Sequence, residues 1–105
     1  MKEVFEVGLD IIKKIQETQS EKLEQTGHLM AQAFMEGHKF FVSGSGHSHT
    51  MAEEMYARAG GFAFVVPILT SELTMTEHPT KSSNIERLSG YAKILVDLYG
   101  VSCGD

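Results

Sequence analysis

Cysteine is almost absent from this sequence. The single cysteine, Cys103, has no partner with which to form a disulfide within the chain. Disulfides accumulate in proteins of oxidising compartments, so a lone thiol favours a reducing environment. We therefore expect a cytoplasmic protein.

Long apolar runs are lacking too. A membrane-spanning helix needs roughly 18 to 20 consecutive apolar residues, and no segment approaches that length. The opening residues, MKEVFEVGLD, carry Glu3, Glu6 and Asp10 where a signal peptide would have a basic stretch followed by an apolar one. We therefore expect no secretory leader and no contact with a membrane.

Positive charge is not concentrated anywhere in the chain. The formal net charge is −5 at pH 7, and the lysines and arginines form no block. Proteins that bind nucleic acids or anionic membranes usually carry such a block, so neither partner is expected. The 105 residues, 42% hydrophobic and 22% charged, have the composition of a single folded domain.

The first part of the chain has a helical pattern. Over residues 2–19 the apolar side chains follow two overlapping helical stripes, which together make a wide apolar surface. A small domain can cover only part of such a surface, which favours a homodimer or a higher homo-oligomer. Thr18 and Glu21 fit a capping box, so the following pattern is a new helix or a continuation that ends near Gly37.

Two short apolar runs follow this helical region. Residues 39–42 and residues 62–66 predict strands, the second one stopped by Pro67. Because both runs are almost continuously hydrophobic, we expect them to be buried on both faces in a parallel sheet. A helix over residues 50–59 connects them, with Met51 and Met55 facing inward.

The remaining residues predict a loop and a helix. Residues 70–82 are polar, and Ser83 with Glu86 fits a capping box that starts a helix running to Tyr99. The fold class is therefore α/β, with a helical extension over residues 1–37 and a βαβα core over residues 38–105. Two strands make too little sheet for such a domain, so we expect the front part of a longer protein.

The turn after the first strand is the candidate binding site. It joins a buried strand to the start of a helix, where backbone N–H groups lack internal partners and favour an anion such as phosphate. Glycines let the backbone approach a ligand, and serine hydroxyls can donate hydrogen bonds. The residues expected to bind phosphate are Ser43, Gly44, Ser45, Gly46, His47 and Ser48.

Other interpretations of this turn differ in what they require. A Walker A loop needs a lysine after its last glycine, and a dinucleotide-binding turn needs a third glycine where His49 stands. Neither pattern is present. The turn can also be a tight connection with serine caps and no ligand.

The quoted residues resemble a known family. The runs F-V-S-G-S-G-H-S-H-T-M-A-E-E and G-G-F-A-F-V-V-P, within residues 40–67, are similar to a sugar isomerase (SIS) domain. They are most like uncharacterised bacterial SIS proteins labelled phosphoheptose isomerases. The resemblance covers essentially the whole chain and implies a flavodoxin-like three-layer sandwich of five parallel strands.

The resemblance also implies a function. SIS domains serve as isomerases, lyases or sugar-phosphate-sensing modules, and residues 43–48 match their first phosphate loop. Their second phosphate loop follows the third strand, and the sequence ends at Asp105, before that strand. We expect a module that binds a phosphosugar or a related carbohydrate derivative. The alternatives are an isomerase of the phosphoheptose type and a fragment that is inactive without the rest of the fold.

Residues after the first predicted strand also carry groups suited to metal binding or to acid–base catalysis. His47, His49 and Glu53 carry metal-binding groups, but their spacing matches no recognised metal site, so no metal and no cofactor are expected. An isomerase needs an acid and a base near the sugar carbonyl. The nearest groups for those roles are His47, Glu53 and Glu54, although a carboxylate at a helix start can simply face the helix dipole.

Overall fold

The computed structural model describes residues 2–105, which form two compact units divided between Gln32 and Ala33. The sequence analysis predicted the boundary between the helical extension and the core slightly later, at Gly37. The elements, in chain order, are α1 (Lys2–Met35), β1 (Phe40–Ser43), the 3₁₀ helix η1 (Gly46–Ser48), α2 (His49–Met55), β2 (Val65–Ile68), the 3₁₀ helix η2 (Ser71–Leu73), α3 (Pro79–Ile85) and α4 (Tyr91–Tyr99).

α1 is one continuous helix through the capping-box sequence. The Thr18 hydroxyl donates to the Lys14 carbonyl at 2.7 Å, a bond within the helix interior and not a cap. The helix ends as predicted at Gly37, which has a φ of +80°. The N–H groups of Gly37 and His38 then bond back to the carbonyls of Phe34 and Ala33, at 3.1 and 2.8 Å.

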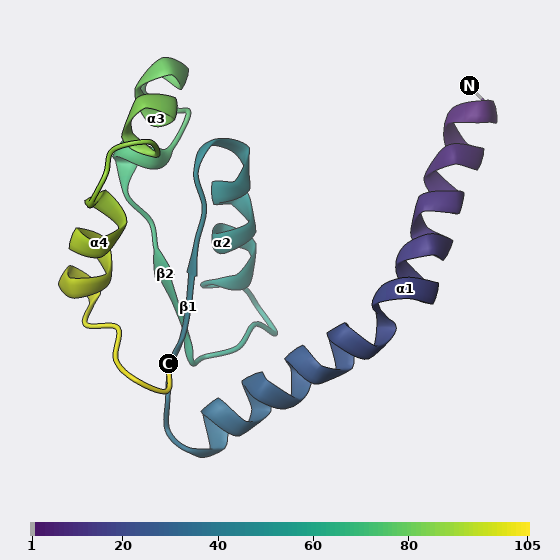
Figure 1. Cartoon of the computed structure of the whole chain (residues 1–105), viewed down its shortest axis with the longest axis horizontal. Helices are drawn as coiled ribbons and strands as arrows, with labels where there is room; N and C mark the ends of the chain where they lie inside the picture. Colours follow the sequence, from purple (N-terminus) through teal and green to yellow (C-terminus); the bar gives the residue numbers. More distant parts are fainter. Residues whose placement is uncertain (1) are drawn as a thin grey trace. The chain divides into compact units, whose positions relative to one another are not determined.

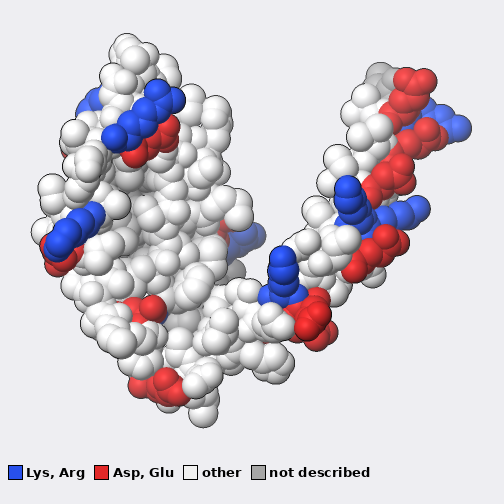
Figure 2. All heavy atoms as spheres, in the orientation of Figure 1, with Lys and Arg blue, Asp and Glu red and all other residues white. Residues whose placement is uncertain are grey.

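The apolar side chains of α1 are exposed. The helix has no buried residue, and Phe5, Ile12 and Leu23 are 69%, 62% and 63% exposed. Acidic and basic side chains are interspersed along it, as Figure 2 shows. This helix is therefore a wide apolar surface bordered by mixed charge.

β1 and β2 pair in parallel and form the only sheet within residues 2–105. The predicted strands are both present, each shifted toward the C-terminus, and the α/β class is confirmed. Pro67 lies within β2, opposite Val42, so it does not stop the strand as predicted. In Figure 1 the two strands run side by side, with α2 beside one face and α4 beside the other.

Because successive side chains of a strand point to opposite sides, each strand contributes residues to both faces of the sheet. On one face Phe41 and Ile68 pack with Leu73 and Leu95 in the main apolar cluster. Val65 and the 1% exposed Ala52 of α2 are buried in addition. Both faces of the sheet are therefore covered only in part. The other strand residues are half-buried, and Ser43 is exposed.

Two helix predictions were wrong. The expected helix over residues 83–99 is two helices, α3 and α4, separated by a turn in which Gly90 has a φ of +86°. Ser83 lies inside α3, so it caps nothing; His78 Nδ1 instead accepts from the Thr80 N–H at 3.2 Å. α2 ends at Met55, and Met51, predicted to face inward, is 66% exposed.

The last residues are tied to the start of β1. The Asp105 carboxylate accepts hydrogen bonds from the Lys39 N–H and from the Ser102 N–H and hydroxyl, each at 2.9 Å. These donors lower the pKa of Asp105 from 3.8 to about 2, the Lys39 amide having the largest effect. The turn therefore helps to hold the strand that leads into the candidate site.

The buried position of Leu95 predicts a test of this core. Leu95 is 8% exposed in α4, whereas Leu98 of the same helix is 74% exposed. Leu95→Ala should lower the free energy of unfolding by about 2 kcal/mol or more, because it leaves a cavity. Leu98→Ala should change it by less than about 0.5 kcal/mol. Urea denaturation measures both, and equal effects would contradict the assignment of the core.

Candidate functional site

The candidate site lies where both strands end. Because β1 and β2 are parallel, their carboxyl ends share one edge of the sheet, the usual place for ligands in open α/β folds. The segment after β1 runs through η1 directly into α2, and the segment after β2 contains η2. Both loops therefore meet at this edge.

Gly44 allows the tight turn after β1. A Cβ atom at this position would lie 2.3 Å from the Ser48 carbonyl oxygen and 2.9 Å from the His49 nitrogen. Only a glycine can pass so close to another stretch of backbone. Gly46 has a φ of +57°, a second conformation that suits glycine. The two glycines thus have structural reasons to be here.

The serine hydroxyls of the loop differ in their present partners. Ser43 Oγ donates to the Ile68 carbonyl at 3.5 Å, which links the ends of the two strands. Ser45 Oγ donates to the Glu86 carboxylate. Ser48 makes no side-chain capping bond and is exposed. Ser45 is therefore the loop hydroxyl already matched with an anionic oxygen.

Glu86 was missed as a site residue by the sequence prediction. Its place three residues after Ser83 suggested a capping box, and no local signal relates it to Ser45, 41 residues earlier. The structure places Glu86 on a hollow of about 450 Å³, here called the loop pocket, with Ser43, Gly44, Ser45, Tyr91 and Leu95 among its lining residues.

A second hollow adjoins the same loop. This threonine pocket has a volume of about 230 Å³, and its lining includes His47, His49, Thr50, Glu53, Thr74 and Thr76. Two of the three predicted acid–base groups, His47 and Glu53, therefore share it. The third, Glu54, forms an ion pair with Arg58 and lines neither pocket.

His49 is buried, although it belongs to the lining of the threonine pocket. It is 5% exposed, and its Nδ1 lies 2.8 Å from Glu53 Oε1. His47 is exposed, and its carbonyl accepts from the Thr50 hydroxyl at 2.7 Å. Across residues 2–105, no three His, Cys, Asp or Glu side chains gather as a metal site.

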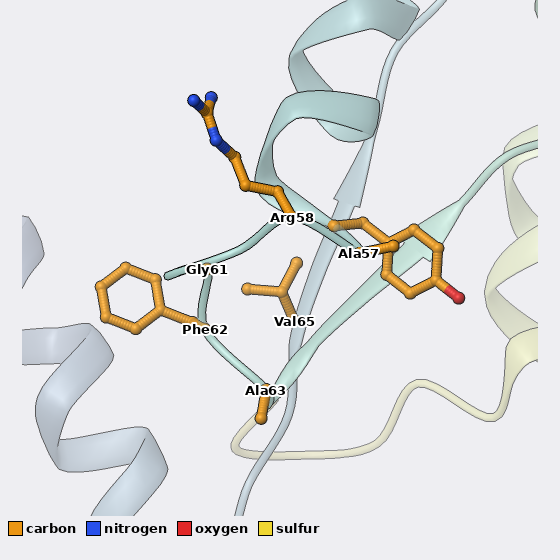
Figure 3. A pocket seen from close by; sticks show the side chains of 7 residues that line it. Ala57, Arg58, Gly61, Phe62, Ala63 and Val65 are labelled. Carbon is orange, nitrogen blue, oxygen red and sulfur yellow. The ribbon is translucent and has the colours of Figure 1, made fainter.

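A third hollow, of about 410 Å³, lies near the start of β2, away from the loop (Figure 3). In that view the Arg58 side chain extends away from Val65, and its guanidinium pairs with Glu54. Phe62 and Tyr56 give the hollow an aromatic border. Because it lies at the start of β2, at the opposite end of the strands from residues 43–48, it is not part of the candidate site.

Comparison with known proteins identifies the family of this chain. The chain matches the family model described as SIS domain over residues 5–105. It therefore belongs to the SIS domain family, as the sequence resemblance indicated.

Curated relatives are bacterial proteins of the UPF0309 group. The chain is 45% identical to one from Halalkalibacterium halodurans and 44% identical to one from Caldanaerobacter subterraneus subsp. tengcongensis. Each match covers 90% of this chain and 39% of the relative. A Brucella ovis protein is 39% identical, over 80% of this chain and 35% of the relative. The chain thus spans less than two fifths of the length of these relatives.

The turn at Gly44 can be tested by adding one methyl group. Gly44→Ala should lower the free energy of unfolding by about 2 kcal/mol or more, because the new Cβ would overlap backbone atoms that cannot move aside. Gly27→Ala, inside α1 with no atom within 4 Å of its Cβ, should instead raise helix stability by up to ~1 kcal/mol. Thermal and urea unfolding measure both; a stable Gly44→Ala protein would refute the close contact.

Proposed function

We propose that this chain provides one half of a site that binds a phosphosugar or a related carbohydrate derivative. The observation that carries the proposal is the loop of residues 43–48, set by Gly44 at the carboxyl edge of the parallel sheet. Membership of the SIS domain family supports it. In this proposal the six loop residues surround the phosphate, as the sequence predicted.

The physical basis is the set of hydrogen-bond donors that residues 45–48 carry. The N–H groups of Gly46 and His47 begin η1, so they have no acceptor within that helix. The hydroxyls of Ser45 and Ser48 add donors on either side. α2 itself is short, so the individual donors contribute more than the helix dipole does.

In this proposal a bound phosphate competes with Glu86 for the Ser45 hydroxyl. A serine hydroxyl has one hydrogen to donate, and that of Ser45 is engaged by the Glu86 carboxylate. A phosphate that takes this hydrogen must displace Glu86, since two anions repel at short range. Ligand entry in this proposal therefore includes a rotation of Glu86 away from Ser45.

The second candidate function is isomerisation of a sugar phosphate. The specific observation that favours it is the pairing of Glu53 with His49 beside the loop, where an acid–base group would be needed. Glu54 is a weaker choice, because Arg58 engages it. Turnover of an aldose phosphate to a ketose phosphate separates this function from binding alone.

The assembly and location of the protein are proposed on separate grounds. The exposed apolar surface of α1 favours association with further copies of the chain. The single cysteine favours the cytoplasm. Within residues 2–105, none of the helices is apolar and long enough to cross a membrane.

The proposal predicts stabilisation by sugar phosphates. A ligand at ten times its Kd should add ~1.4 kcal/mol to the stability of the protein, seen as a higher melting temperature. Ser45→Ala should remove most of this shift, whereas Ser89→Ala, at an exposed residue outside both pockets, should keep it. A melt that ignores every phosphate would favour the fragment that is inactive without the rest of the fold.

Displacement of Glu86 leads to a separate prediction. Glu86→Gln keeps an oxygen that can accept from Ser45 but removes the negative charge, so affinity for a sugar phosphate should rise about tenfold. Glu24→Gln, on the exposed surface of α1, makes the same change in net charge and should have no such effect. Isothermal titration calorimetry measures both. Weaker binding by Glu86→Gln would instead mean that Glu86 contacts the ligand directly.

A further inference from the structure

One nitrogen of the His49 ring has no partner. The side chain is buried, Nδ1 faces Glu53 at 2.8 Å, and Nε2 makes no hydrogen bond with any group of residues 2–105. Leaving a buried polar atom unpaired lowers the stability of a fold, and native structures keep few such atoms. The Nε2 atom of His49 therefore points to a group that residues 2–105 do not supply.

For a neutral imidazole, the contact with Glu53 determines what that group must be. An ionised carboxylate can only accept a hydrogen bond, so the proton of a neutral imidazole lies on Nδ1. Nε2 then carries a lone pair and is itself an acceptor. Phosphate oxygens also accept, so a phosphate is the wrong partner for this atom. A hydroxyl group, which donates, is the right one.

The surroundings of His49 suit a hydroxylated molecule. Three threonines line the threonine pocket, and their hydroxyls already form hydrogen bonds with nearby oxygens. The Thr50 hydroxyl donates to the His47 carbonyl at 2.7 Å, and the Thr74 hydroxyl donates to the Ser71 carbonyl at 2.8 Å. The Thr74 and Thr76 hydroxyls bond to each other at 2.7 Å. Each threonine oxygen can still accept a hydrogen bond. The pocket therefore offers acceptors to a ligand that brings hydroxyl donors.

The threonine pocket is also next to the proposed phosphate site. Gly46 and His47 belong both to the loop and to the lining of this pocket. The Nε2 atom is buried in the free protein, so a lining side chain must move to reveal it. Met75, whose sulfur would lie 3.8 Å from a Cβ on Gly46, has the flexible unbranched chain suited to such a movement.

We propose that His49 Nε2 accepts a hydrogen bond from a hydroxyl on the carbon chain of a sugar phosphate whose phosphate group lies on residues 43–48. This inference rests on the proposed function and assigns a contact to the end of the ligand that lies away from its phosphate. His49 is then a residue that determines specificity for the sugar, and Glu53 is a positioning residue that fixes the imidazole tautomer.

The test compares a ligand with a carbon chain and one without. Isothermal titration calorimetry is performed with inorganic phosphate, glucose 6-phosphate and sedoheptulose 7-phosphate. His49→Asn retains a donor near the Nδ1 position and removes Nε2. It should weaken the tighter-binding sugar phosphate about tenfold, as expected for one lost hydrogen bond, and leave inorganic phosphate within about twofold. His49→Gln, whose amide oxygen can reach toward the Nε2 position, should recover part of the loss.

Controls separate this inference from the proposed function. His28→Asn, at an exposed residue of α1, should leave all three affinities unchanged. Three outcomes would each overturn the role of His49 alone. His49→Asn could bind the sugar phosphate as tightly as the wild type does, or it could lose affinity for all three ligands in parallel. The wild type could also prefer neither sugar phosphate to inorganic phosphate. A wild type that binds none of the three removes the proposed function and this inference with it.

A measurement on the unmutated protein covers the case in which His49→Asn does not fold. In ¹⁵N-histidine-labelled protein, the Nε2 resonance of His49 should shift on addition of the sugar phosphate and stay in place with inorganic phosphate. An Nε2 resonance that is unmoved by a bound sugar phosphate would overturn the proposal.

Discussion

The contact between the backbone at Gly44 and that at Ser48 sets the geometry of the whole site. It reverses the chain within a few residues of the end of β1, and a side chain at position 44 would prevent it. Because the reversal is so short, α2 begins at once and returns along the sheet. The loop hydroxyls, the buried His49 and the Glu53 that faces it all take their positions from this turn.

The parallel pairing of β1 and β2 then brings other segments of the chain next to this turn. The register that joins Ser43 to Ile68 brings the segment after β2 to the same edge, and that segment supplies Thr74 and Thr76. Glu86, at the end of α3, reaches Ser45 from the same side. The site is thus assembled from short pieces that lie far apart in sequence.

Much of this arrangement was open to prediction from sequence. Continuous apolar runs identified both strands, glycine identified the end of α1, and the Gly-Ser turn was placed between strand and helix. These signals are local, and local backbone preferences decide them. The Gly90 break was missed because Leu88 and Ala92 continue an apolar stripe across it, so periodicity alone suggested one helix.

The burial of His49 and the contact between Ser45 and Glu86 had no local signal. In a helix as short as α2, Met51 and Ala52 are both reasonable inward residues, and only packing on the sheet selects the smaller one. The same choice turns His49 inward and so creates its pair with Glu53. The bond between Ser45 and Glu86 spans two loops, and nothing near either residue predicts the other.

Pro67 has a consequence for the two sides of the sheet. It lies inside β2 without a backbone N–H to offer, and proline within a strand is tolerated where that strand is an outer one. β1 contains no proline and keeps its full set of main-chain groups on the side away from β2. The two edges of this sheet therefore differ: Pro67 makes the outer edge of β2 less able to pair, whereas the outer edge of β1 can accept another strand.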